Sequence, residues 1–98
     1  MHKVAVVGAS GYTGVELLRL LITHPGVELS AVTSRQYAGQ PVAEVFPSLQ
    51  GCLDLCCEDV DLDSLAHRAD LVFTAVPHQT AMTIVPQLLT AGCKVIDL

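Results

Sequence analysis

Two kinds of hydrophobic pattern alternate along the chain. Short continuous runs rich in valine, isoleucine and leucine stand between stretches in which apolar residues recur every three or four positions. Continuous runs of this length are typical of strands that are buried on both faces of a parallel sheet. The runs that predict strands lie at residues 3–7, 29–34, 53–57, 70–76 and 94–98.

The stretches between these runs predict helices. Residues 13–23 carry a broad apolar face that stops at Pro25 and Gly26, a pair that ends helices. Residues 42–45 predict one short turn of helix, and residues 62–67 predict a second short helix. The last predicted helix has the spacing of an amphipathic stripe, with its apolar residues at Ala81, Ile84, Val85, Leu88 and Leu89.

One proline and one glycine give this last helix its expected shape. Pro86 lies inside the apolar stripe. Because proline removes a backbone donor and clashes one turn back, it predicts a kink or a restart of the helix. Gly92 follows the stripe and predicts the end of the helix.

Three glycines form a loop between the first strand and the first helix. Gly8 is suited to a tight turn out of the strand, Gly11 to close approach of a pyrophosphate, and Gly14 to close packing of the helix on the sheet. The helix N-terminus adds unpaired N–H groups and a partial positive charge. Ser10 and Thr13 offer hydroxyl donors. In this context the loop predicts a dinucleotide site.

The alternation of strands and helices with short connections requires a parallel sheet with right-handed crossovers. We therefore predict the α/β fold class, as a Rossmann-like doubly wound parallel sheet in three α/β/α layers that ends after about five strands. Residues 1–98 are expected to form one incomplete NAD(P)-binding domain. Cofactors bind such sheets beyond the carboxyl ends of the strands.

The end of the second predicted strand favours NADP over NAD. NAD-specific domains usually place a carboxylate there to bind the ribose hydroxyls. This chain has Ser34 and Arg35 instead. A hydroxyl and a planar guanidinium suit a 2′-phosphate, so the predicted cofactor is NADP(H).

Composition and charge exclude other classes of protein. The chain is 51% hydrophobic and 15% charged, against about 25% charged in an average soluble domain. No apolar run approaches the roughly 20 residues of a membrane span. The excess of hydrophobic residues therefore indicates a sheet buried on both faces and an apolar surface that meets another domain or subunit. A net charge of −5 without a basic patch argues against nucleic acid. The N-terminus lacks a signal peptide pattern, so a cytoplasmic protein is expected.

The four cysteines do not form a recognisable chemical pattern. Cys52, Cys56, Cys57 and Cys93 lack the spacing and the histidine pair of a zinc site. Disulfides are rare in the cytoplasm. We therefore expect free, buried thiols and no metal site.

Several segments together resemble one enzyme family. They are residues 7–17, His24-Pro25, residues 32–35 with Ala38-Gly39, residues 75–78, and residues 91–98. In this order they resemble the amino-terminal part of the N-acetyl-γ-glutamyl-phosphate reductases, which act in arginine biosynthesis. The resemblance covers essentially the whole chain.

The resemblance implies a reaction and a substrate. The family reduces N-acetyl-γ-glutamyl phosphate to the semialdehyde with NADPH and releases phosphate. A cysteine thiolate forms a thioester and a histidine assists proton transfer. Both, together with the catalytic and substrate domain, belong to segments beyond Leu98. No cysteine here matches the nucleophile, so the resemblance implies no catalytic residue within the chain. The chain alone is expected to bind cofactor without turnover, and the full-length enzyme to be a homo-oligomer.

The resemblance also assigns site residues. The phosphate loop and the 2′-phosphate site keep the residues given above, with Tyr12 added to the loop. The backbone of Ala75, Val76 and Pro77 is expected to lie along the cofactor towards the nicotinamide. His78 could border the substrate site or simply start the next helix, and Tyr12 could pack on the cofactor or on another domain.

Two alternatives share the same sequence features. An aspartate-semialdehyde dehydrogenase uses the same thioester chemistry, but it fits residues 32–35 and 75–78 less well. A non-enzymatic regulator that senses NADP would also need no catalytic cysteine. The sequence of the 98 residues alone does not separate the reductase from the regulator.

Overall fold

The computed structural model describes residues 2–8, 12–34, 36–47, 55–59 and 61–98, without the side chains of Tyr12 and His78. Within them the chain forms a four-stranded sheet with the order β2-β1-β3-β4, and all neighbouring strands are parallel. The strands are β1 (His2–Val7), β2 (Val27–Thr33), β3 (Leu71–Thr74) and β4 (Lys94–Asp97).

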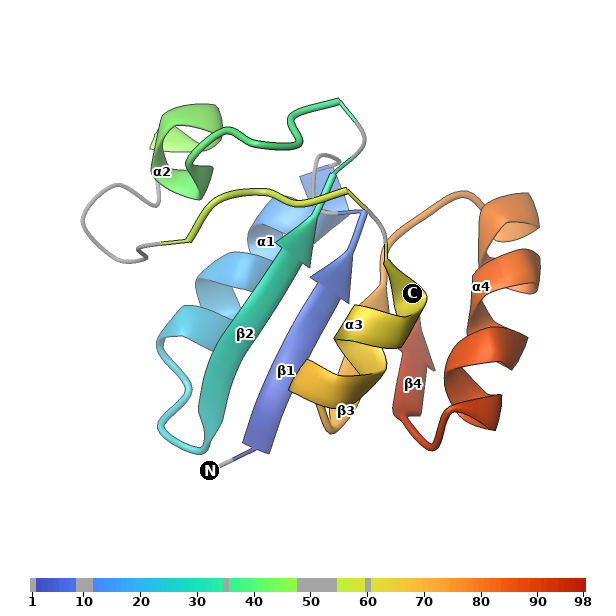
Figure 1. The fold of residues 1–98 in the computed structure, drawn as a ribbon. Coiled ribbons are helices and arrows are strands. Elements are labelled where there is room, and N and C mark those ends of the chain that lie inside the picture. Colours follow the sequence, from blue (N-terminus) through green and yellow to red (C-terminus); the bar gives the residue numbers. More distant parts are fainter. Residues whose placement is uncertain (1, 9–11, 35, 48–54, 60) are drawn as a thin grey trace.

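Helices cover both faces of this sheet, as a doubly wound fold requires. One face carries the first helix, and the third and fourth helices cover the other (Figure 1). The helices are α1 (Tyr12–Ile22), α2 (Val42–Val45), α3 (Leu62–Arg68) and α4 (His78–Thr90). The predicted α/β class and the three-layer arrangement are confirmed. In the described part of the chain, no helix has the length and apolar character needed to cross a membrane.

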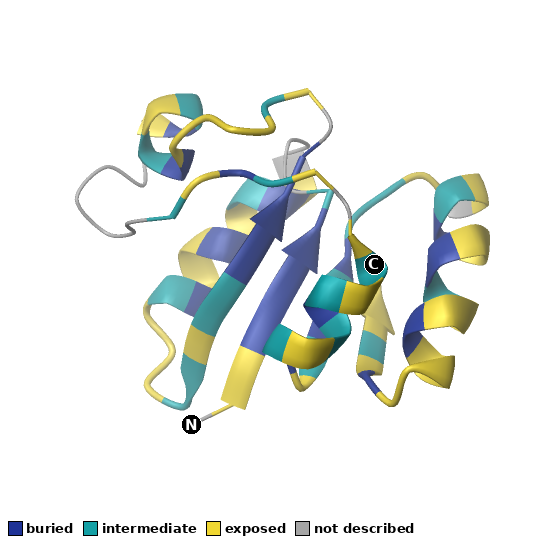
Figure 2. Cartoon of the chain, in the orientation of Figure 1, coloured by how far each residue is buried: buried dark blue, intermediate teal, exposed yellow. Residues whose placement is uncertain are grey.

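The central strand β1 shows why the sequence folds this way. Its last four residues are completely buried (Figure 2). Val4 and Val6 pack with Leu18 of α1, whereas Ala5 and Val7 pack in a second cluster with α3 and α4. Because successive side chains of a strand point to opposite faces, an unbroken apolar run fills two cores at once. The prediction of a strand buried on both faces is confirmed.

Strand β2 contains one irregularity that the sequence did not predict. The register with β1 shifts between Val4 and Ala5, whose partners are Leu29 and Ala31, so Ser30 is the extra residue of a bulge. The Ser30 hydroxyl donates to the Val4 carbonyl at 3.3 Å. A side-chain donor therefore replaces a ladder bond at this point.

The third predicted strand, at residues 53–57, does not form a regular strand in the described residues, and Leu53 and Asp54 lie outside them. Cys56 makes an isolated antiparallel bridge with Pro41, and Glu58 makes a parallel bridge with Thr33. The segment thus lies on the outer edge of β2, where a fifth strand belongs, but its other backbone groups bond to the loop before α2 rather than to β2.

The helix does not restart at Pro86, because α4 runs as one helix from His78 to Thr90. The N–H that proline lacks would have bonded to the carbonyl of Met82. Both residues are exposed, so water can bond to that carbonyl and the helix continues.

Gly92 ends α4 as predicted. Its φ of 93° lies in the left-handed region. The N–H of Gly92 donates to Leu89 O and the N–H of Cys93 donates to Leu88 O, both at 3.1 Å. This is the double hydrogen bond of a Schellman end, and it directs the chain into β4.

Candidate functional site at the carboxyl edge of the sheet

The order of the strands places a switch point at one end of the sheet. From β1 the chain crosses through α1 to β2 on one side, whereas β3 lies on the other side of β1. At the carboxyl edge the loops after β1 and β3 therefore diverge to opposite faces, and ligands of open α/β sheets bind in the crevice between such loops. The residues that leave the strands there are Gly8, Ser34 and Ala75.

Two features of the structure require glycine at position 8. Its φ of 84° is strained for any residue with a side chain. A Cβ at Gly8 would overlap Val76 Cγ1 and would lie 2.8 Å from Ala75 O. The loops after β1 and β3 are therefore in direct contact at this glycine.

Backbone hydrogen bonds join the three loops at the same place. Gly8 N–H donates to Thr33 O at 3.1 Å and to Thr33 Oγ1 at 3.2 Å. Ala75 N–H donates to Val7 O at 2.8 Å. The end of β1 is thus fixed to both of its neighbours, which makes the edge a rigid platform.

The N-terminus of α1 follows the loop that leaves β1 at this edge. Ser10 and Gly11 lie outside the described residues, and Tyr12 opens the helix. Thr13 is exposed in the first turn and Gly14 is buried. The first turn contains no acidic residue, so no carboxylate opposes the N–H groups and partial positive charge that attract a phosphate.

Ser34 has a structural role at the end of β2. It is buried, its hydroxyl oxygen accepts from the Tyr37 N–H at 3.3 Å, and its own N–H donates to Glu58 O at 2.9 Å. The hydroxyl proton is left as the donor that it can offer to a ligand. Arg35, the other half of the predicted 2′-phosphate site, lies outside the described residues.

Residues 75–77 connect β3 to α4 along the same edge. Ala75 and Val76 are half-buried and Pro77 is exposed at the position before the helix. No side chain caps the N-terminus of α4. His78 is the first residue of the helix, as the simpler of its two interpretations expected, and its side chain is not described.

A polar pair that the sequence analysis missed also lies at this edge. Thr74 and Asp97 end β3 and β4 and are direct partners in the sheet register. The buried Thr74 hydroxyl donates to Asp97 Oδ1 at 2.7 Å. The sequence does show that each of these polar residues ends an apolar run. Only the register of β3 and β4 shows that the two side chains meet.

Thr74→Val should lower the free energy of unfolding by about 1–2 kcal/mol, because the shape is kept while a charge-assisted hydrogen bond is lost. Denaturant titration measures this change. Thr74→Ser keeps the hydroxyl and should recover at least half of the loss. Equal stability of the valine variant and the wild type would contradict the role of the bond.

A hollow of about 460 Å³ lies between the start of α3 and one side of α4. Amide and hydroxyl side chains surround a smaller apolar portion in this hollow. The lining residues are Asp59, Leu62, Gln79, Thr80, Thr83, Ile84 and Gln87. Such a mixture suits a flat polar group, for example a nucleobase.

The described cysteines are free thiols, and two of the three are buried. Cys57 and Cys93 are free and buried as predicted, whereas Cys56 is free but exposed. Burial raises the pKa of the Cys57 and Cys93 thiols, with smaller contributions from Cys56 and from Asp70 respectively. A raised pKa keeps a thiol protonated and unreactive. Cys93 also lies before β4, at the opposite end of the sheet from Gly8. Over the described ranges, no three His, Cys, Asp or Glu side chains are grouped to hold a metal ion.

Comparison with known families gives one match that spans the chain. The family described as "Semialdehyde dehydrogenase, NAD binding domain" matches residues 3–98. The chain is similar to the N-acetyl-gamma-glutamyl-phosphate reductase of Desulfotalea psychrophila, at 65% identity over 98 residues, and to that of Methanocella arvoryzae, at 56%. All of this chain is covered, but it spans only 28% and 29% of those relatives. The resemblance predicted from the sequence is confirmed.

Solved structures show the same fold at low sequence identity. An aspartate semialdehyde dehydrogenase with NADP from Candida albicans aligns with a TM-score of 0.82 and 24% identity, covering 99% of this chain and 29% of that one. A dihydrodipicolinate reductase from Paenisporosarcina sp. TG-14 aligns with a TM-score of 0.74 and 18% identity, covering 99% and 37%. These likenesses support the doubly wound architecture.

Proposed function

This chain belongs to the semialdehyde dehydrogenase NAD-binding domain family, and we propose that it is the NADP-binding portion of an N-acetyl-γ-glutamyl-phosphate reductase. The observation that carries the proposal is the contact of Gly8 with Ala75 and Val76 at the switch point, beside a helix N-terminus free of acidic residues. The relatives at 65% and 56% identity support the reaction class.

Different residues of the carboxyl edge are proposed to bind different parts of the cofactor. The pyrophosphate would lie at the start of α1, where Gly8 and Gly11 keep the backbone open and Ser10 and Thr13 add hydroxyl donors. Tyr12 and the buried Gly14 belong to the same loop and helix. The end of β2 would hold the ribose 2′-phosphate through Ser34 and Arg35, as the sequence predicts.

The loop after β3 would position the nicotinamide. Ala75 and Val76 are held against β1 by the bond from Ala75 N–H to Val7 O, so Ala75, Val76 and Pro77 offer a fixed backbone edge. The hollow between α3 and α4 fits the adenine. When bound, NADPH supplies the hydride that converts the acyl group to an aldehyde.

The nucleophile is proposed to lie outside these 98 residues. The Cys57 and Cys93 thiols have raised pKa values, and Cys93 lies at the end of the sheet opposite to Gly8. A cysteine of the whole protein would displace phosphate to form the thioester, as in the family that the sequence resembles. The 98-residue chain would then bind NADP(H) without turnover.

The whole protein is proposed to be a cytoplasmic homo-oligomer that acts on a small acyl phosphate. Large apolar side chains are exposed on several elements, including Leu20 of α1, Met82 and Leu89 of α4, and Ile96 of β4. Such surface is suited to contact with another domain or subunit.

A chimeric enzyme tests the proposed reaction. The matching amino-terminal segment of the Desulfotalea psychrophila reductase is replaced by this chain, which is 65% identical to it. The chimera should oxidise NADPH when given N-acetyl-γ-glutamyl phosphate, and the same chimera with Gly8→Val should not. A folded chimera that does not bind NADPH, or that binds it and does not turn over N-acetyl-γ-glutamyl phosphate, would overturn the proposal.

A further inference from the structure

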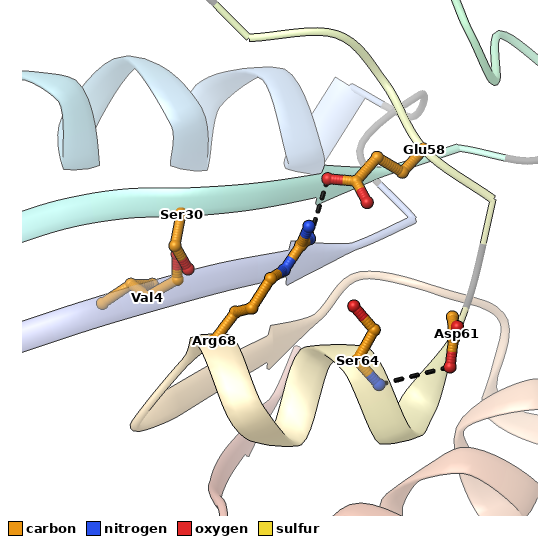
Figure 3. A network of polar contacts seen from close by, with 6 residues as sticks. All are labelled: Val4, Ser30, Glu58, Asp61, Ser64 and Arg68. Carbon is orange, nitrogen blue, oxygen red and sulfur yellow. Dashed lines mark hydrogen bonds and ion pairs between the residues drawn. The ribbon is translucent and has the colours of Figure 1, made fainter.

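An ion pair joins α3 to the segment that lies outside β2. Nη2 of Arg68, the last residue of α3, donates to Glu58 Oε2 at 2.8 Å. Both side chains are 38% exposed. Figure 3 shows the arginine extending from the end of α3 over the sheet to meet the glutamate. Nothing in the proposed cofactor site yet accounts for this pair.

Glu58 is directly attached to the end of β2. Its N–H donates to Val32 O and its carbonyl accepts from the Ser34 N–H, both at 2.9 Å. The backbone of Glu58 therefore lies beside the residue that is proposed to contact the 2′-phosphate. An unpaired carboxylate here would repel a phosphate, because exposed charges interact over about 8 Å at physiological ionic strength.

A carboxylate at this place would also favour the other cofactor. NAD-specific domains use an acidic side chain near the end of the second strand to accept hydrogen bonds from the ribose hydroxyls. In the structure the Glu58 carboxylate points towards Arg68 (Figure 3). The arginine thus neutralises the charge and also holds the carboxylate in one direction.

Stability alone is a poor explanation for the pair. Half-exposed ion pairs contribute little to folding. The Arg68 Nε is buried and has no hydrogen-bond partner among the described residues, and such a group is unfavourable. Helix α3 has other features that fix it, since the Asp61 carboxylate accepts from the Ser64 N–H at its start (Figure 3) and Leu65 is buried beneath it.

We propose that Arg68 is a positioning residue for cofactor choice, which neutralises Glu58 and holds its carboxylate away from the end of β2 so that the site accepts a 2′-phosphate. This inference rests on the proposed NADP-binding function. It adds a determinant of specificity that lies on α3, outside the loops that follow β1, β2 and β3.

Titrations of the 98-residue chain with NADP and with NAD test the inference. Arg68→Met should lower the ratio of NADP to NAD affinity by roughly three- to tenfold, the scale of a partly screened charge interaction. Glu58→Gln should leave the ratio unchanged or raise it, and the double variant should resemble Glu58→Gln. The loss in Arg68→Met should shrink as salt is added, and Arg68→Lys should retain most of the wild-type ratio.

Arg19→Met is the matched control, because Arg19 forms a similar 2.9 Å pair with Glu16 on the exposed side of α1. It should leave the ratio unchanged. If Arg68→Met and Glu58→Gln weaken both cofactors equally, the pair is only structural and the inference is overturned while the proposed function stands. If the wild-type chain binds neither cofactor, the inference and the proposed function are both overturned. Thermal melts of each variant separate loss of folding from loss of binding.

Discussion

Gly8→Ala is expected to lower the free energy of unfolding by about 2–4 kcal/mol and to abolish measurable NADP binding. The left-handed φ of 84° disfavours any side chain by roughly 1–2 kcal/mol. The new methyl group would also overlap Val76 and approach Ala75 O to 2.8 Å, and overpacking of this kind typically adds about 1–3 kcal/mol. The backbone strain and the overlap can be relieved only if the loops after β1 and β3 move apart. The cofactor is proposed to bind between these two loops.

Gly39→Ala provides the control for this result. Gly39 has a nearly equal φ of 89°, but a Cβ there would meet no atom within 4 Å. It should therefore show only the cost of the backbone conformation, about 1–2 kcal/mol, and should bind NADP as the wild type does. Denaturant titration and cofactor titration of both variants give the comparison. Equal losses in the two variants would contradict the close contact at Gly8.

Arg35→Ala is expected to weaken NADP binding by about 1.5–3 kcal/mol, the range for hydrogen bonds to charged groups. NAD lacks the 2′-phosphate, so its affinity should hardly change. Isothermal titration with each cofactor measures both values. Arg19→Ala removes an equal charge from the exposed side of α1 and should affect neither. If NADP and NAD weaken by the same factor in Arg35→Ala, the assignment of the 2′-phosphate site is wrong.

Local sequence was sufficient for the parts of the fold in which one segment determines its own structure. The run at residues 3–7 predicted a strand buried on both faces, and β1 contributes to two separate cores. Gly92 predicted the end of α4, and its left-handed φ with the bond to Leu89 O confirms it. Gly8 predicted a tight turn for the same reason.

The features that the sequence did not predict depend on segments distant along the chain. The bulge at Ser30 appears only in the register with β1, where the Ser30 hydroxyl donates to the carbonyl of Val4. Thr74 meets Asp97 only through the register of β3 and β4.

The pair of Glu58 and Arg68 has the same origin, since it needs the segment before α3 to cross the end of β2. The expected restart at Pro86 failed for a related reason. The free-energy cost of the backbone hydrogen bond that proline cannot donate depends on whether the site is exposed to solvent, and Pro86 is exposed.

Titration of the isotope-labelled 98-residue chain with NADP, followed by amide NMR, tests the central claim most directly. The account predicts saturable shifts centred on Gly8, Thr13, Ser34 and Ala75 at the carboxyl edge, with weaker binding when NAD replaces NADP. Shifts confined to the opposite end of the sheet, around His2 and Lys94, or no shifts with either dinucleotide, would contradict it.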